Sequence, residues 1–266
     1  MQVEEPFGPL LRTWRIRRRL TQEALAADAE VSTRHVSFLE AGKAKPSREM
    51  VLLLASAMEL ELRDRNVLLG AAGFAPVYRS SPLESPEMAN VRRVLDVILK
   101  GHEPFGAVVV DRMTNILLLN QGAQRLIGEF MPEPPADPIV STNLLHAMFH
   151  PQGLRPSIVN WDQVAGMIIE RLHRELALRP GDEQQQALRR ALLSYPDVPT
   201  RFHMLGGTEL VEPFVSTHLR RGELSVRLVS TLTTLGTAID VTAQEIVIES
   251  FFPADEVSAR FFRSPA

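Results

Sequence analysis

TQEALAADAEVSTRHVSFLE, residues 21–40, predicts two short helices joined by a tight turn. Leu25 and Ala26 share one face of the first helix, and Val36 and Leu39 lie three positions apart on one face of the second, as the helical repeat requires. Ala26 is small at the position where the two helices would approach most closely. The apolar faces therefore predict that the two helices pack against each other.

Both predicted helices begin after a hydroxyl side chain. Thr21 precedes the first helix and Ser32 precedes the second, and such side chains cap backbone N–H groups that are otherwise unpaired. This arrangement is typical of a helix-turn-helix, whose second helix enters the major groove of DNA. We expect Arg34 and its neighbours to read base edges, and the flanking residues to bind phosphates. The predicted DNA-binding residues are Gln22, Ser32, Thr33, Arg34, Ser37, Lys43 and Lys45.

The charge of this region supports the same interpretation. The whole chain has a formal net charge of -3, but residues 10–48 contain nine Arg or Lys against four Asp or Glu. A local positive excess is favourable where a phosphate backbone binds. The run WRIRRR, residues 14–19, is by itself equally typical of a solvated helix face. Together with the helix pair, the charge favours double-stranded DNA as a partner.

Length and composition limit what the rest of the chain can be. The chain has 266 residues, and the part after the helix pair, about 180 residues, is enough for a second core. The absence of cysteine excludes disulfides, cysteine-bound zinc and thiol redox chemistry. The first ten residues lack the features of a signal peptide, and no apolar run could span a bilayer. We expect a soluble cytoplasmic protein with no membrane contact.

Enzyme motifs are missing from the sequence. It has no GxSxG elbow, Walker loop, dinucleotide glycine fingerprint or HExxH motif. His146 and His150 lie four positions apart on one helix face, which is half of a metal site, but no carboxylate follows in the same turn. A helix cap or a packed imidazole explains this pair better. We therefore expect no catalytic residues, no metal site and no required cofactor.

A linker divides the chain. Residues 74–86, FAPVYRSSPLESP, contain three prolines and three serines. We place a helix-turn-helix domain at residues 1–74, the linker at residues 75–86 and a second domain at residues 87–266. The second domain opens with a helix striped with apolar residues that ends at Lys100, a candidate connector or dimer seam.

The second domain contains both strand and helix patterns. GAVVVD, residues 106–111, and NILLLN, residues 115–120, predict a hairpin. Helical segments follow, and FVSTHLR, LSVRLVSTLTTLG and QEIVIESFF predict three further strands near the end. This order predicts an α+β domain with a mainly antiparallel sheet, most simply covered by helices on a single face.

The first domain resembles a known family. RTWRIRRRLTQEALA, VSTRHVSFLEAGKAKPS, MVLLLASAMEL and RDRNVLLGAAG, within residues 9–74, are similar to Xre-type, lambda-repressor-like DNA-binding domains. The resemblance implies an all-α five-helix fold in which Arg15 forms an ion pair with Glu40. Arg19 and Glu30 stand where this family often has glycine, and a left-handed backbone at Glu30 would cost on the order of 1 kcal/mol relative to glycine.

The second domain resembles another family. HEPFGAVVVDR, NQGAQRL, NLLHAMFHPQGLRPSIVNW and LTTLGTAIDVTAQEIVIESFFPADE are similar, in this order, to the C-terminal region of MmyB-like transcriptional regulators. The resemblance implies a PAS-like domain with a pocket for a small apolar ligand, with fatty-acid-like molecules as the leading class. Relatives often have a proline near Gly106 and an aromatic residue near Met113 and Thr114, so we expect the pocket shape to differ.

A ligand of this class would need apolar walls and one polar anchor. An acyl chain gains roughly 0.8 kcal/mol for each buried CH2 group. Arg171 or Arg155 is suited to a carboxylate head group, although a salt bridge with Glu170 or Glu175 explains Arg171 equally well. Each apolar candidate is also explained as ordinary core. The predicted ligand-binding residues are Val108, Val110, Leu117, Leu119, Phe149, Trp161, Ile168, Arg171, Phe202, Phe214 and Leu228.

These expectations combine into a ligand-responsive transcriptional regulator. It would bind double-stranded DNA as a homodimer, with two heads on half-sites about one helical turn apart. The alternative is a DNA-binding regulator whose second domain only dimerises or binds a protein partner. A head used mainly for protein contacts is a further alternative, against which Arg34 and the local positive charge argue.

Overall fold

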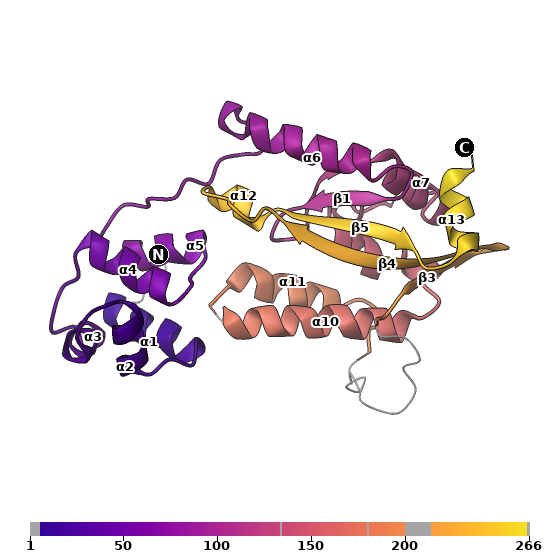
Figure 1. Cartoon of the computed structure of the whole chain (residues 1–266). Coiled ribbons are helices and arrows are strands. Elements are labelled where there is room, and N and C mark those ends of the chain that lie inside the picture. Colours follow the sequence, from indigo (N-terminus) through magenta and orange to yellow (C-terminus); the bar gives the residue numbers. More distant parts are fainter. Residues whose placement is uncertain (1–5, 134, 180, 200–213, 265–266) are drawn as a thin grey trace. The chain divides into compact units, whose positions relative to one another are not determined.

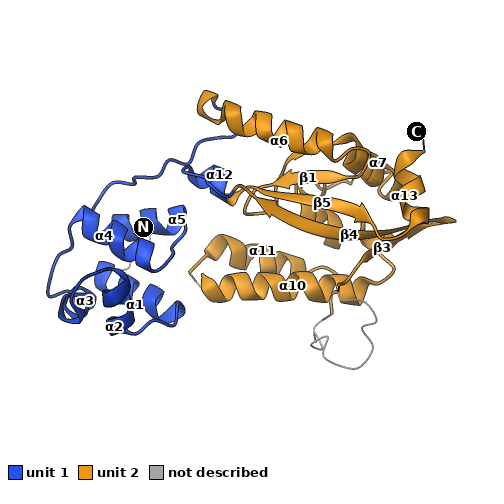
Figure 2. Cartoon of the chain, viewed as in Figure 1, with its two compact units in different colours: residues 1–85, 236–244 blue, residues 86–235, 245–266 orange. Residues whose placement is uncertain are grey.

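The computed structural model shows two compact units (Figure 2). It describes residues 6–133, 135–179, 181–199 and 214–264. The first unit comprises residues 1–85 and 236–244, and the second comprises residues 86–235 and 245–266. The first unit therefore includes a short segment that follows most of the second unit in the sequence.

The N-terminal part of the first unit, residues 6–85, is built on five helices. They are α1 (Phe7–Arg17), α2 (Gln22–Asp28), α3 (Thr33–Glu40), α4 (Arg48–Ala57) and α5 (Leu62–Ala71). Their apolar faces meet in one core, in which Leu25, Val36 and Leu39 are fully buried. The five-helix fold expected for this part of the chain is confirmed.

The hydroxyl caps of the helix-turn-helix form as expected. Thr21 Oγ1 accepts a hydrogen bond from the backbone N–H of Ala24 at 3.1 Å. Ser32 Oγ accepts one from the backbone N–H of His35 at 3.2 Å. Each cap satisfies an N–H group that has no partner inside its own helix. The start of α3, which carries the expected base contacts, is thus fixed by its own sequence.

Two positions where the family often has glycine adopt a left-handed backbone. The φ angle is 58° at Arg19, after α1, and 52° at Glu30, in the turn between α2 and α3. Both side chains are exposed, so the strain comes from their own Cβ atoms rather than from crowding by neighbours. The turn thus forms with a residue other than glycine, in the left-handed conformation that is expected to cost on the order of 1 kcal/mol relative to glycine.

The second unit is an α+β domain built around an antiparallel sheet. Its described strands are β1 (Ala107–Val110), β2 (Ile116–Leu119), β3 (Thr217–Arg221), β4 (Leu224–Thr234) and β5 (Val247–Pro253). Their order in the sheet is β2-β1-β5-β4-β3, so the first hairpin pairs with the last strand of the chain. The strands expected from the sequence, and the α+β class, are confirmed.

Helices cover both faces of this sheet. The described helices of this unit are α6 (Ala89–Gly101), α7 (Gln121–Phe130), α8 (Pro138–Thr142), α9 (Leu144–Phe149), α10 (Trp161–Leu178), α11 (Glu183–Leu193) and α13 (Glu256–Arg263). Short 3-10 turns occur at Pro86–Met88 and Arg155–Ser157. Helix α6 lies on one side of the sheet, and α10 and α11 lie on the other (Figure 1). The covering of a single face expected from the sequence does not occur, because α6 buries its apolar stripe, Leu95 and Leu99, beside β1.

Replacing Glu30 with glycine should raise the free energy of unfolding by up to about 1 kcal/mol, because glycine adopts a positive φ without a Cβ penalty. Thermal unfolding of the full chain measures this change. Glu23→Gly is the matched control, since Glu23 lies in the first turn of α2, where glycine should cost about 1 kcal/mol. A lower unfolding temperature for Glu30→Gly would contradict the strain assigned to this turn.

Candidate functional site

A buried ion pair holds the end of α3 to α1. Arg15 Nε and Nη2 donate to the two carboxylate oxygens of Glu40 at 2.6 and 2.9 Å, and Arg15 Nη1 donates to the carbonyl of Leu20 at 2.8 Å. Gln22 Nε2 donates to Glu40 at 2.8 Å. Burial opposes ionisation of Glu40, but the hydrogen bonds from Arg15 and Gln22 outweigh it, so the pKa of Glu40 lies below its ordinary value. The ion pair implied by the resemblance is present.

This network also affects one of the expected phosphate contacts. The amide nitrogen of Gln22 is engaged by Glu40, so its approach to a phosphate would compete with a charge-assisted hydrogen bond. Lys43 and Lys45 are exposed in the segment after α3. The two lysines are therefore better placed than Gln22 to contact a phosphate without disturbing the fold.

The outer face of α3 presents Arg34 on an aromatic support. The guanidinium carbon of Arg34 lies 5.1 Å from the ring centroid of Phe38, and Lys43 Nζ lies 5.9 Å from the same centroid. Phe38 is 37% exposed. Cation–π contacts of this kind restrict the motion of an exposed arginine. Thr33 and Ser37 are half-buried beside it, and Ser32 is occupied as the helix cap.

The second unit contains a cavity of about 360 Å³ between the sheet and helices α9 and α10. In the β4–β5 ladder, Leu232 is paired with Glu249, and Ser230 with Phe251, and directly opposed residues share one face of a sheet. These side chains line the same cavity. Its apolar wall includes Leu126, Leu145, Met148, Leu154, Ile158, Ile168, Leu219, Leu228 and Phe251.

One side of this cavity opens to solvent. Met167 on α10, Phe214 before β3 and Leu232 on β4 all line it, and their side chains are 37%, 46% and 50% exposed. Exposed apolar side chains grouped around a cavity are typical of a ligand-binding opening. Within the described residues, these three side chains mark the side of the cavity where a ligand would enter.

A charged end interrupts the apolar wall. Arg171, Arg174 and Glu249 line the cavity together with Ser230. Burial raises the pKa of Glu249, while the charge of Arg171 and a hydrogen bond from Ser230 partly oppose this shift. A carboxyl group with a raised pKa can remain protonated and donate a hydrogen bond. The cavity thus offers both a cation and a candidate neutral acid to a polar head group.

The arginines at this end form only weak ion pairs on α10. Arg171 Nε lies 3.9 Å from Glu175 Oε1, and Arg174 Nη1 lies 3.4 Å from Glu170 Oε1. Both pairs are spaced by one helical turn and partly or largely exposed, so each contributes little to stability. Arg171 can therefore form the pair expected with Glu175 and still face the cavity.

Only some of the ligand-binding residues predicted from the sequence line this cavity. Ile168, Arg171, Phe214 and Leu228 line the cavity. Val108 and Val110 are buried in a small core with Ala123 and Leu144, which Leu119 borders. The rings of Phe149 and Trp161 pack edge to face, with centroids 4.8 Å apart. The predicted residues that do not line the cavity are Val108, Val110, Leu117, Leu119, Phe149 and Trp161. Phe202 lies outside the described residues.

Arg155, the alternative anchor, lies elsewhere. Its guanidinium carbon is 4.5 Å from the centroid of the Trp161 ring, in a cation–π arrangement, and Arg155 does not line the cavity. Arg171 is therefore the better placed of the two expected anchors.

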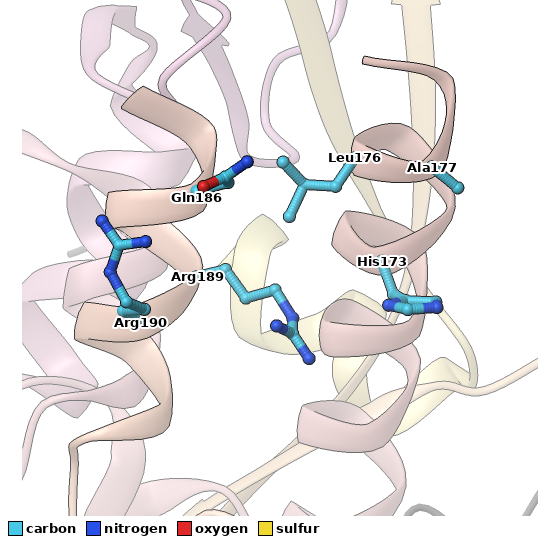
Figure 3. Close-up of a pocket in the computed structure, with 6 residues that line it drawn as sticks. All are labelled: His173, Leu176, Ala177, Gln186, Arg189 and Arg190. Carbon is cyan, nitrogen blue, oxygen red and sulfur yellow. The ribbon is translucent and has the colours of Figure 1, made fainter. Parts of the chain in front are cut away.

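A second cavity, of about 410 Å³, lies between α10 and α11 (Figure 3). Arg189 extends from α11 toward α10 in Figure 3, beside His173. Leu176 and Ala177 are the apolar side chains of its lining, and Gln186 and Arg190 complete it. A groove with so little apolar wall gives an acyl chain little to bind. The smaller, more apolar cavity beneath β4 and β5 is thus the better candidate for a ligand site.

Packing accounts for the two histidines, of which His146 lies on α9 and His150 follows its last residue with an extended backbone, so the shared helix face expected from the sequence does not form. His146 Nδ1 lies 2.6 Å from the hydroxyl of Tyr195, and the rings of His146 and His150 both meet the Tyr195 ring edge to face. Burial lowers the pKa of His146. Within the described residues, no group of three or more potential metal ligands is assembled.

The comparisons with known proteins identify the family. The family described as MmyB-like transcription regulator ligand binding domain matches residues 91–264. The chain belongs to this family. The helix-turn-helix family matches residues 11–64. This MmyB-like regulator thus joins a helix-turn-helix head to a domain of the ligand-binding family.

Other comparisons add little about this MmyB-like regulator. No curated protein matches the chain. One solved structure that matches is titled "Structure of an RNA-binding Light-Oxygen-Voltage Receptor", with 9% identity, a TM-score of 0.28 and coverage of 98% of this chain. The regulator spans 61% of the length of that receptor. Among the described helices, none combines the length and apolar character needed to cross a bilayer.

The sites of the regulator include residues that the sequence reading did not select. Phe38 supports Arg34 from one helical turn away, and the spacing of four positions could have indicated it. Glu249 interrupts the apolar strand QEIVIESFF, and because burying an unpaired acid is costly, its position could have indicated a functional role. Met148 and Arg174 could not be selected from the sequence, because their place in the lining depends on how α9 and α10 pack.

Glu249→Gln should remove a pH dependence from the stability of the regulator. Because the folded pKa of Glu249 is raised, the folded state retains a proton that the unfolded chain has already released, and stability falls as pH rises between the two pKa values. The variant should match the wild type near pH 4 (about the unfolded value) and be more stable near neutral pH. Thermal unfolding across this range measures the effect.

Glu223→Gln is the matched control, since Glu223 is exposed in the turn before β4. It should follow the pH profile of the wild type. Identical pH profiles for Glu249→Gln and the wild type would show that Glu249 ionises as an ordinary carboxyl group.

Proposed function

We propose that this regulator binds a specific DNA sequence as a homodimer and senses a fatty-acid-like molecule in the cavity beneath β4 and β5. The observation that carries the proposal is the cavity itself, which combines apolar walls with a charged end at Arg171. Its volume of about 360 Å³ falls within the range usual for small-molecule sites. We assign no catalytic role to either unit.

The chemistry of the cavity favours an amphipathic acid. Each CH2 group placed against the apolar wall contributes roughly 0.8 kcal/mol, so the acyl chain supplies most of the affinity. Arg171 is suited to a carboxylate, with which a guanidinium forms two parallel hydrogen bonds. A protonated Glu249 would donate a further hydrogen bond without repelling the anion.

The DNA contacts follow from the exposed face of α3. Arg34 would bind guanine O6 and N7 in the major groove, preordered by Phe38. Lys43 and Lys45 would bind phosphates and position the head without reading sequence. A homodimer would place two such heads on half-sites about one helical turn apart.

Ligand binding changes DNA binding only if the ligand prefers one arrangement of the dimer. A hundredfold preference supplies roughly 2.7 kcal/mol, which is enough to shift a balanced equilibrium. The rival function is a second unit that only dimerises or binds a protein. Val94 and Val97 favour this rival, because they are 44% and 66% exposed on α6 and lie near one face of that helix.

Native mass spectrometry of the purified regulator, followed by denaturing extraction, tests the ligand proposal. A dimer that releases an acyl compound or another small apolar acid supports the sensor. A dimer that is empty, and that dodecanoate does not stabilise against heat, supports the rival function instead.

Arg34→Ala should weaken binding to the selected operator by roughly 10- to 100-fold, because one bidentate base contact is worth about 1–3 kcal/mol. The operator is obtained by selecting bound sequences from a random DNA pool, and affinities are measured by fluorescence anisotropy. Lys43→Ala should weaken operator and random DNA alike, and Arg93→Ala on α6 is the charge-matched control. Equal losses on both DNAs for Arg34→Ala would show that Arg34 binds phosphate.

Arg171→Gln should reduce the affinity for dodecanoate by roughly 10- to 100-fold, the usual effect of losing a charge-assisted hydrogen bond of about 1.5–3 kcal/mol. Affinity for dodecanol, which has the same chain without the carboxylate, should hardly change. Isothermal titration calorimetry measures both. The control is Arg220→Gln, on the exposed part of β3, which removes the same charge and should leave both affinities unchanged. If Arg171→Gln weakens the binding of dodecanoate and of dodecanol equally, the carboxylate head group binds elsewhere.

A further inference from the structure

The connection between β4 and β5 is part of the compact unit that contains the DNA-binding helices. Residues 236–244 belong to the first unit, although β4 and β5 on either side belong to the second (Figure 2). The connection includes most of the short helix α12 (Val241–Glu245), in which Val241 and Ala243 are buried. The chain therefore leaves the sensor sheet, contributes to the head unit, and returns to the sheet.

Hydrogen bonds attach this connection to the linker after the DNA-binding helices. The carboxylate of Asp240 accepts from the backbone N–H of Ser81 at 3.1 Å, and the backbone N–H of Val241 donates to the carbonyl of Arg79 at 2.7 Å. The hydroxyls of Ser80 and Thr242 lie 3.1 Å apart. These contacts join residues about 160 positions apart in the chain.

Gln244 attaches the same connection directly to α5. Its Oε1 atom accepts a hydrogen bond from the backbone N–H of Leu62, the first residue of α5, at 2.7 Å. The cap residue Glu61 makes no side-chain capping hydrogen bond, so an amide group from residue 244 serves an N–H that α5 cannot satisfy by itself. The start of α5 thus depends on a residue 182 positions later in the chain.

Helix α5 in turn holds the linker. Asn66 Oδ1 accepts from the backbone N–H groups of Val77 and Tyr78 at 3.0 and 3.1 Å, and Asn66 Nδ2 donates to the carbonyl of Tyr78 at 2.7 Å. The linker is consequently held by α5 at residues 77–78 and by the β4–β5 connection at residues 79–81. Helix α5, the linker and the connection form one hydrogen-bonded assembly.

The strands on either side of the connection are also the wall of the ligand cavity. Leu232 on β4 and Glu249 on β5 line the cavity and are direct partners in the ladder. The ladder continues without a register shift from this pair to Thr234 opposite Val247. A displacement of the cavity wall is therefore transmitted through paired backbone to both ends of residues 236–244.

We propose that residues 236–244 are the coupling element of this regulator, and that Gln244 is its positioning residue for α5. The inference rests on the proposed function for its ligand, but the attachment to α5 and the linker stands on its own contacts. An occupant that separates or tilts β4 and β5 displaces the connection while it stays attached, and Gln244 and Asp240 pass that displacement to α5 and to the linker. The state of the cavity thereby reaches the unit that binds DNA.

Substitution of Gln244 tests the coupling. In the full-length wild type, dodecanoate should change operator affinity by on the order of tenfold, a usual size for allosteric coupling. Gln244→Ala should bind dodecanoate as the wild type does, because Gln244 lies outside the cavity lining, but should lose most of this change. Gln124→Ala, on the exposed face of α7, is the matched control and should keep it. An undiminished change in Gln244→Ala would overturn the proposal.

A reversible crosslink tests the attachment from the opposite direction. The chain contains no cysteine, so Ser80→Cys with Thr242→Cys introduces a single pair of thiols where the hydroxyls are 3.1 Å apart. The oxidised protein should keep the response to dodecanoate, because the connection works while attached. Loss of the response on oxidation, with recovery on reduction, would show that the connection must detach, and would contradict the proposal.

Hydrogen exchange separates failure of the coupling from failure of the ligand proposal. Leu232→Trp enlarges an exposed side chain of the cavity wall and takes the place of an occupant. If residues 236–244 couple the wall to α5, this substitution should change amide exchange at the start of α5, and the change should disappear when Gln244→Ala is added, as in a double-mutant cycle. If amide exchange at the start of α5 is the same in Leu232→Trp as in the wild type, the coupling is overturned. If the cycle gives the expected result but the wild type does not bind dodecanoate, only the proposed ligand is overturned.

Discussion

The ladder between β4 and β5 is the constraint on which the second unit depends. It is the longest run of paired residues in the described sheet, extending from Leu228 opposite Pro253 to Thr234 opposite Val247. Because opposed residues share a face, this register decides at once which side chains line the cavity. A shift of one residue would turn Glu249 away from Arg171 and expose the apolar wall. Cavity, charged end and connection to the head are therefore set by a single register.

The two units manage buried charge in different ways. In the head, Glu40 is ionised, because Arg15 and Gln22 compensate its desolvation within a closed network. In the sensor, desolvation outweighs the neighbouring Arg171 at Glu249. An ion pair whose hydrogen bonds are all formed fixes the geometry around it. A carboxyl group whose desolvation is only partly offset can change its protonation when a polar ligand group binds beside it. The first arrangement suits a rigid scaffold for α3 and the second suits a binding site.

Local signals explain which parts of this structure could be predicted from the sequence. Hydroxyl caps at Thr21 and Ser32 and the apolar spacing in α2 and α3 act within one turn of helix, so the head could be predicted closely. The cavity depends on which strands are neighbours: inward positions of β1, such as Val108, meet α7 and α9 rather than open space. The hydrogen bond from Leu62 to Gln244 joins positions with no shared local pattern, and periodicity alone cannot indicate it.

The exposed apolar side chains around the cavity have a kinetic consequence. Met167, Phe214 and Leu232 are exposed at one side of the cavity, and a ligand that enters between them exchanges with solution on the timescale of side-chain and loop motion rather than of domain unfolding. Occupancy would then follow the free concentration of the ligand as it rises and falls. A molecule enclosed during folding would remain bound as a permanent structural component, whereas a ligand that exchanges with solution can be bound and released many times.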